Sequence, residues 1–199
     1  MNRPKQYNPV LTKENILEQA KQLFSKKGYA ATTISDICRA TGVSKGSIYH
    51  HFKNKEDLFI SLAEHSFGNS WKDWDIKSSA YTSVIDKLYA YSDLFVDNLE
   101  RPLTKAGEDF INSVGMESEI GQRFYTIVTG YIERFELLIT EGIERGELVS
   151  EDPKELAFII LSYFSGLSDN LQFMDKEAMK PRFRKAVHLL LEGIRQRQE

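Results

Sequence analysis

Residues 33–58 read TISDICRATGVSKGSIYHHFKNKEDL, and this stretch decides the fold of the chain. Its first part predicts a short helix, because apolar residues recur at helical spacing from Ile34 and a threonine stands just before them as a cap. Gly42 ends that helix, at a position where the left-handed backbone conformation costs little free energy only for glycine. Ser44 can then cap a second helix over residues 45–50, so the stretch predicts two short helices joined by a tight turn.

The second predicted helix has an unusual outer face. Gly46 lies near its start and costs about 1 kcal/mol relative to alanine, which favours a position where the backbone closely approaches a partner. Ile48 and Phe52 point inward, whereas the outward positions carry small polar groups, one cation and rings with polar tips. Such a face suits a DNA groove and its phosphates better than a protein groove. The alternative is a helical hairpin that only packs.

The next helix begins near Lys55, after Asn54 as its cap. A cation in the first turn of a helix opposes the helix dipole. A phosphate between the helix end and the lysine would remove that penalty, so Lys55 is a candidate phosphate ligand.

Several segments of this region resemble the DNA-binding domain of TetR-family transcriptional regulators, namely residues 28–34, 36–37, 42–52 and 55–58. The remaining three-quarters of the chain match that family only in length and helical pattern. The resemblance implies an all-α homodimer of about nine helices per chain. Its N-terminal helix-turn-helix domain would span residues 1–54, and a domain that binds an effector and dimerises would span residues 55–199. Within the first domain, the sequence predicts a flexible arm over residues 1–11 and a first helix that Thr12 caps.

The resemblance also implies which residues contact double-stranded DNA. Base-edge or close groove contacts are predicted for Lys45, Gly46 and Ser47. Phosphate contacts are predicted for Thr33, Ser44, Tyr49, His50 and Lys55. The dimer would place two such helices in successive major grooves, about 34–36 Å apart, on a palindromic operator.

The distribution of charge agrees with this division. The net charge of −3 combines +5 in residues 1–60, from ten Lys/Arg and five Asp/Glu, with −8 in residues 61–199. The positive charge coincides with the helix-turn-helix motif, as is expected when that domain binds DNA phosphates. The single cysteine and the lack of an apolar signal segment predict a cytoplasmic protein, and no apolar run is long enough to span a membrane.

The C-terminal half predicts further helices, of which the last two are strongly apolar. Asp152, Pro153 and Glu155 mark the start of one, and Pro181 is expected in the first turn of the final one. Two such helices exceed what a small bundle can bury, so a two-fold four-helix interface is predicted. Its predicted residues are Leu156, Ile160, Tyr163, Phe164, Leu167, Val187, Leu190, Leu191 and Ile194.

An effector site is predicted among the rings of the C-terminal domain. Its candidate residues are Phe67, Trp71, Tyr91, Phe95, Phe110, Phe124 and Tyr131. Nearby carboxylates would suit a cationic ligand, but the rings suit a small hydrophobic molecule, and they could equally be core. The predicted function is a ligand-responsive repressor. An activator, an architectural DNA-binding dimer without effector, and an enzyme on a helical fold are the alternatives.

The sequence shows no catalytic constellation. No glycine-rich phosphate loop or nucleophile elbow is present, and adjacent carboxylates such as Glu108 and Asp109 diverge by about 100° on a helix, so they form no dyad. No His or Cys lies at metal-ligand spacing around Cys38. We therefore expect no enzyme activity, no metal and no cofactor.

Overall fold

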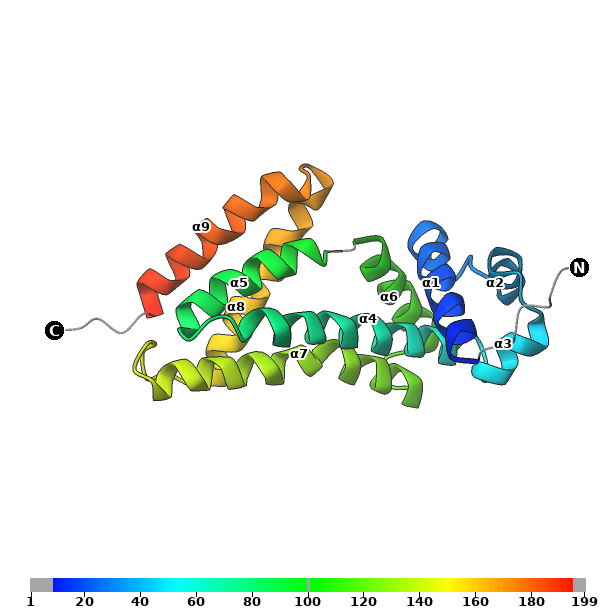
Figure 1. Ribbon diagram of the computed structural model, residues 1–199, viewed down its shortest axis with the longest axis horizontal. Helices are drawn as coiled ribbons and strands as arrows, with labels where there is room; N and C mark the ends of the chain where they lie inside the picture. The colour runs from blue at the N-terminus through cyan, green and yellow to red at the C-terminus, as the bar shows by residue number, and fades with distance from the viewer. Residues whose placement is uncertain (1–8, 100, 195–199) are drawn as a thin grey trace, which may run out of the picture. The chain divides into compact units, whose positions relative to one another are not determined.

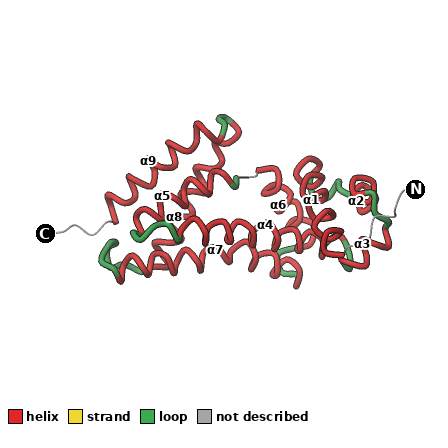
Figure 2. The backbone as a smooth tube through the Cα atoms, in the orientation of Figure 1, coloured by secondary structure: helices red, strands yellow, loops and turns green. Residues whose placement is uncertain are grey.

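The computed structural model describes residues 9–99 and 101–194, which fold into α-helices joined by short turns (Figures 1 and 2). This confirms the all-helical fold. The helices are α1 (Pro9–Lys27), α2 (Ile34–Thr41), α3 (Lys45–His51), α4 (Lys55–Ser78), α5 (Val84–Asp97), α6 (Arg101–Val114), α7 (Glu119–Glu144), α8 (Pro153–Ser168), the short 3₁₀ helix η1 (Asp169–Gln172) and α9 (Lys176–Ile194). No helix in the described ranges combines the length and hydropathy needed to cross a membrane.

The first helix begins earlier than the sequence indicated. We expected an arm over residues 1–11 and a cap at Thr12, but α1 already starts at Pro9. Residues 1–8 of that predicted arm lie outside the described part of the chain. A proline at the first position of a helix is favourable, because its missing N–H would have had no partner there.

Local chemistry sets the ends of α2. Thr33, rather than Thr32, is its cap: the Thr33 hydroxyl accepts the backbone N–H of Asp36 at 3.1 Å, and the Thr33 N–H donates to the Asp36 carboxylate at 3.1 Å. The Thr33 hydroxyl also donates to the Asp36 carboxylate at 2.9 Å, and this bond, together with that from the Thr33 N–H, lowers the pKa of Asp36. Gly42 ends the helix with φ of 73°, in the left-handed region that the sequence predicted for it.

The position of Pro181 in the final helix differs from the prediction. Pro181 lies inside α9, five residues after its start at Lys176, and not in the first turn. The cap is Asp175, whose carboxylate accepts the N–H of Ala178 at 2.8 Å. Proline there removes one helical hydrogen bond, and the buried side chains of Met179 and Phe183 on either side of it offset that loss.

The chain divides into two compact units, and we describe each by itself. Unit 1 contains residues 1–66 and 100–127, and unit 2 contains residues 67–99 and 128–199. This division differs from the boundary between residues 54 and 55 that the sequence indicated. The reason is that α6 packs on α1, and the first part of α4 contributes buried side chains to the same unit.

Five aromatic rings form the centre of unit 1. Phe59 of α4 contacts Phe24, Tyr29, Phe110 and Phe124, with ring centroids 5.0, 5.1, 4.8 and 5.8 Å away, respectively. These rings come from α1, the turn after it, α4, α6 and α7. The cluster therefore joins α6 and the start of α7 to the helix-turn-helix segment.

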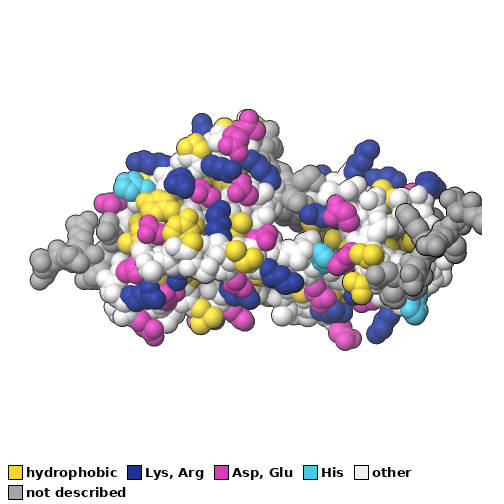
Figure 3. Space-filling view, in the orientation of Figure 1, with side chains coloured by type: hydrophobic (Ala, Val, Ile, Leu, Met, Phe, Trp, Pro, Cys, Tyr) yellow, Lys and Arg dark blue, Asp and Glu magenta, His cyan; other side chains and the backbone are white. Residues whose placement is uncertain are grey.

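An apolar core between α5, α7, α8 and α9 holds unit 2 together, with Phe135, Phe164 and Phe183 deeply buried in it. At the surface, the Arg184 guanidinium of α9 binds the carboxylate of Asp93 of α5 through contacts of 2.9 and 2.6 Å. Figure 3 shows basic and acidic side chains interspersed over this part of the surface. This ion pair joins α9 to α5.

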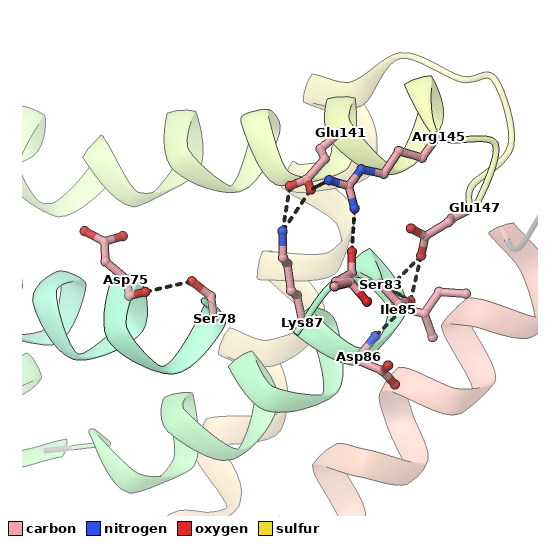
Figure 4. A network of polar contacts seen from close by, with 10 residues as sticks. Asp75, Ser78, Ser83, Ile85, Asp86, Lys87, Glu141, Arg145 and Glu147 are labelled. Carbon is pink, nitrogen blue, oxygen red and sulfur yellow. Dashed lines mark hydrogen bonds and ion pairs between the residues drawn. The ribbon is translucent and has the colours of Figure 1, made fainter. Parts of the chain in front are cut away.

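A polar network joins the end of α7 to the start of α5 (Figure 4). The Glu147 carboxylate accepts the Ser83 hydroxyl at 2.7 Å and the Ile85 N–H at 3.3 Å. Lys87 donates to the Glu141 carboxylate at 2.8 Å, and Arg145 contacts the same carboxylate at 2.8 Å. Ser83 caps α5, and a carboxylate from 64 residues further along the chain holds the hydroxyl of this cap.

Candidate functional site

The start of α3 presents the predicted DNA contacts on the surface. Ser44 caps the helix, with its hydroxyl accepting the Ser47 N–H at 3.1 Å. Ser44 and Lys45 are exposed and Ser47 is half-buried, while Ile48 on the inner side is fully buried. The chain thus packs one side of α3 and leaves the other free for a partner.

No described residue packs closely against Gly46. A β-carbon added to it would meet only the Ser44 hydroxyl, at 3.8 Å, which is ordinary van der Waals contact. Its φ is not positive either, unlike that of Gly42. Neither packing among the described residues nor backbone conformation therefore requires glycine at this position, and the backbone of α3 is open to a partner there.

The rings of α3 are also on the surface. Tyr49 is 46% exposed, and the Lys45 ammonium lies 5.8 Å from the centre of its ring. His50 is exposed, and its ring lies 5.3 Å from that of His51. Thr33, at the start of α2, is exposed too. The surface therefore combines hydroxyls, one ammonium and rings with polar tips, which suits phosphate and base edges.

His51 was not among the predicted contacts. It is half-buried beside an open groove that is also lined by Lys13 of α1 and Glu64 of α4. Burial lowers the pKa of His51, and the neighbouring charges of His50 and Lys13 lower it further. The lowered pKa favours the neutral form of the imidazole.

Lys55 differs from the other predicted DNA contacts. Its ammonium donates to the backbone carbonyls of Tyr29 at 3.1 Å and Thr32 at 3.2 Å. It also lies 4.1 Å from the centre of the Tyr29 ring. The sequence did not indicate these contacts, because Tyr29 and Thr32 are more than 20 residues away from Lys55.

The structure distributes the predicted effector residues over both units. Phe110 and Phe124 belong to the ring cluster of unit 1, where Phe110 is fully buried. Tyr91 is buried in unit 2, with its ring centroid 4.8 Å from that of Phe135. The others, in unit 2, are half-buried: Phe67, Trp71, Phe95 and Tyr131.

The predicted dimer residues also separate into two groups. Five of them are buried in the core of their own chain: Leu156, Ile160, Phe164, Val187 and Leu191. Leu167, Leu190 and Ile194 are half-buried, and Tyr163 is exposed. The same helices expose apolar side chains that the sequence did not single out, namely Phe158 and Ile159 of α8 and Leu189 of α9. Helical spacing identified the apolar helices but did not show which of their faces the chain buries.

Within residues 9–99 and 101–194, no three His, Cys, Asp or Glu side chains are grouped so that they could hold a metal ion. Cys38 is a half-buried free thiol. The candidate site is therefore the surface of α2 and α3, which carries exposed hydroxyls, the Lys45 ammonium and rings with polar tips.

Two family models and a set of curated relatives match this chain. Residues 16–62 match the family model for bacterial regulatory proteins of the tetR family, and residues 68–196 match that of the QacR-like C-terminal region. The HTH-type transcriptional regulator QacR of Staphylococcus aureus is 30% identical over 159 residues, which cover 78% of this chain and 83% of that protein. The relatives are transcriptional regulators and not enzymes.

Solved structures share the fold. FadR of Bacillus subtilis in complex with stearoyl-CoA has a TM-score of 0.73 at 22% identity, covering 87% of this chain and 96% of that one. A transcriptional regulator of Saccharomonospora viridis in complex with choline has a TM-score of 0.78 at 18% identity, covering 94% of this chain and 100% of that one. On the two family models and the likeness to QacR, the chain belongs to the TetR family of transcriptional regulators.

Proposed function

We propose that the protein is a repressor that binds a palindromic operator as a homodimer in the cytoplasm and is released by a small hydrophobic effector. The observation that carries DNA contact by α3 is its exposed face, where Gly46, against which no described residue packs closely, leaves the backbone open beside the exposed Lys45 and Tyr49. Lys45, Ser47, Tyr49 and the residues around them would read bases and hold phosphates.

A footprint tests the operator. The purified full-length protein is expected to protect two half-sites in DNA from its own promoter region, with an affinity that falls steeply with salt. A reporter under that promoter then separates repression from activation. Protection without any sequence preference would favour the architectural alternative.

Replacing Gly46 by alanine is expected to leave the fold intact and weaken operator binding about tenfold or more. The added methyl has room within the chain, and alanine favours a helix, but the methyl would hold the backbone off the DNA. Thermal unfolding and operator titration measure the two effects. Gly130→Ala is the matched control, because a β-carbon there meets nothing within 4 Å and Gly130 lies on α7. Equal operator affinity of both variants would contradict close approach at Gly46.

The dimer would use the apolar side chains that α8 and α9 leave exposed. Ile159 and Tyr163 lie one turn apart on α8, so they share a face, and they are 50% and 40% exposed. Phe158 and Leu189 add further apolar surface on the same two helices. Burying such side chains against a second copy is the simplest way to cover them.

The half-buried rings of unit 2 support an effector site. Trp71 and Tyr131 pack against the core but are only partly buried. Trp71 stacks on Tyr91, with ring centroids 6.3 Å apart. The Arg134 guanidinium already lies 5.0 Å from the Trp71 ring and pairs with Asp75, so that ring face has a cation of its own. This arrangement favours a hydrophobic effector over a cationic one.

Release of the operator tests the class of effector. Stearoyl-CoA, which FadR of Bacillus subtilis binds, is the hydrophobic probe, and choline is the small cationic probe. We expect stearoyl-CoA to dissociate the footprinted complex and choline to leave it intact, because the long acyl chain buries far more apolar area on the rings than choline does. Dissociation by choline alone would assign a cationic effector instead.

A further inference from the structure

Arg123, near the start of α7, contacts two carboxylates of α4. Its guanidinium lies 2.7 Å from the Glu64 carboxylate and 3.8 Å from the Asp57 carboxylate. Asp57 and Glu64 are two turns apart on one face of α4, and Asp57 is in the first turn of that helix. All three residues belong to unit 1. One side chain of α7 therefore reaches the end of α4 that follows the recognition helix α3.

Asp57 also holds the turn between α3 and α4. Its carboxylate accepts the N–H of Lys53 at 3.0 Å, and its own N–H donates to the Asn54 side chain at 2.7 Å. Lys53 directly follows Phe52, the residue that ends α3. The carboxylate Oδ2 thus holds the backbone after α3, while Oδ1 faces Arg123. Asp57 therefore contacts both the start of α7 and the residue that follows α3.

The ring cluster attaches α7 within unit 1 without help from Arg123. The ring of Phe124, the next residue, lies 5.1 Å from that of Phe110 and 5.8 Å from that of Phe59, between centroids. The Arg123 and Glu64 side chains are 50% and 46% exposed, and exposed ion pairs add little to the free energy of unfolding. What a guanidinium adds is a directional contact with carboxylates, which favours one rotational setting of α7 against the first turn of α4.

A second arginine of α7 makes a similar contact in unit 2, which α7 enters at residue 128. Arg134 pairs with Asp75 of α4 at 3.2 Å and lies 5.0 Å from the Trp71 ring, which belongs to the proposed effector site. Arg123 and Arg134 are eleven residues apart on α7, as Glu64 and Asp75 are on α4. Eleven residues make about three turns, so both arginines lie on one face of α7. A ligand on the Trp71 ring would therefore act on the face of α7 that carries Arg123.

On the basis of the proposed operator binding and effector site, we propose that Arg123 is a positioning residue that couples α7 to the recognition helix α3 through Asp57. In the operator-binding state, the guanidinium holds both carboxylates of α4. An effector that displaces α7 moves the guanidinium away from Asp57, and the backbone after α3 loses a fixed support. The two states of the protein then differ in this contact, as an effector-driven shift requires.

Operator titration with full-length Arg123→Met tests the coupling, because methionine keeps the apolar stem and removes the guanidinium. Without effector, we expect about fivefold weaker binding, the upper end for exposed ion pairs. The slope of log K against log salt should stay unchanged, because no phosphate contact is lost. Stearoyl-CoA should weaken operator binding by a smaller factor than in the wild type. Arg145→Met is the matched control, with a side chain 49% exposed on the same helix, and should keep both wild-type values.

Asp57→Asn isolates the contact between α7 and the turn. Asparagine can still accept the Lys53 N–H, but its neutral amide no longer pairs with Arg123. We expect Asp57→Asn to reproduce the loss of operator affinity in Arg123→Met, and the double variant to lose no more than either single variant. Additive losses in the double variant would overturn the inference, because the two residues would then act separately.

Amide hydrogen exchange provides a readout that needs neither DNA nor effector. In the free protein, Arg123→Met is expected to speed exchange of the Lys53 amide, which Asp57 holds, while Arg145→Met leaves it unchanged. The thermal midpoint of Arg123→Met should stay within about 4 °C of the wild type, since the ring cluster is intact.

Unchanged exchange at Lys53 in Arg123→Met would overturn the inference, and so would an undiminished effect of stearoyl-CoA on its operator binding. A wild-type protein that binds no operator, or that stearoyl-CoA does not release, would instead refute the proposed function at that step. The exchange at Lys53 would still decide in either case whether Arg123 holds the turn after α3.

Discussion

Phe59→Ala is expected to destabilise unit 1 by about 3–5 kcal/mol, the range measured for fully buried phenylalanines. Phe59 is 2% exposed and contacts four other rings, so its loss leaves a cavity that no single neighbour can fill. Since Phe110 and Phe124 lose the same contact, α6 and the start of α7 loosen together with the helix-turn-helix segment. Operator binding is expected to fall with the folded fraction.

Two probes can localise this effect. Both tryptophans of the chain, Trp71 and Trp74, belong to unit 2, so tryptophan fluorescence follows that unit, whereas far-ultraviolet circular dichroism follows all helices. We expect urea to shift the circular-dichroism transition of Phe59→Ala more than its fluorescence transition. Phe173→Ala is the matched control, because Phe173 is 76% exposed and its loss should cost nearly nothing. Equal stability of the two variants would contradict the ring cluster.

Ile159→Asp is expected to separate the dimer and thereby abolish tight operator binding. The side chain is 50% exposed in the single chain, so aspartate costs little there, but a carboxylate buried without a partner in an apolar interface costs several kcal/mol. We therefore expect the dissociation constant of the dimer to rise about 100-fold or more. Sedimentation at several protein concentrations measures it directly, and the operator footprint should shrink or disappear.

Leu137→Asp provides the comparison for Ile159→Asp. Leu137 is also apolar, and 69% exposed, but it lies on α7, outside the proposed dimer surface. Its variant should remain dimeric and bind the operator with wild-type affinity. A dimer that tolerates aspartate at Ile159 would place the interface on another surface, and sensitivity at Leu137 would point to α7.

The features predicted correctly from the sequence depend on neighbours along the chain. Thr33, Ser44 and Asp152 cap their helices as expected, because a cap needs only a side chain that reaches an N–H two or three residues ahead. Gly42 ends α2 for the same local reason. Local rules therefore sufficed for the helix-turn-helix segment, including its exposed face.

The features that were missed depend on residues far apart in the chain. The carbonyl partners of Lys55 precede it by 23 and 26 residues, so the sequence did not indicate these contacts. A pattern of rings likewise did not reveal that Phe110 and Phe124 join the ring cluster of unit 1. Periodicity likewise identified α8 as apolar but not which of its sides the chain itself covers.

The discontinuous composition of unit 1 has a consequence for synthesis of the chain. Its ring cluster takes Phe24, Tyr29 and Phe59 from the first 66 residues and Phe110 and Phe124 from residues 100–127. A ribosome adds residues from the N-terminus onward, so α1 to α3 emerge well before the rings that complete their core. The nascent DNA-binding segment must wait, with apolar surface uncovered, until α6 and the first turns of α7 have left the ribosome.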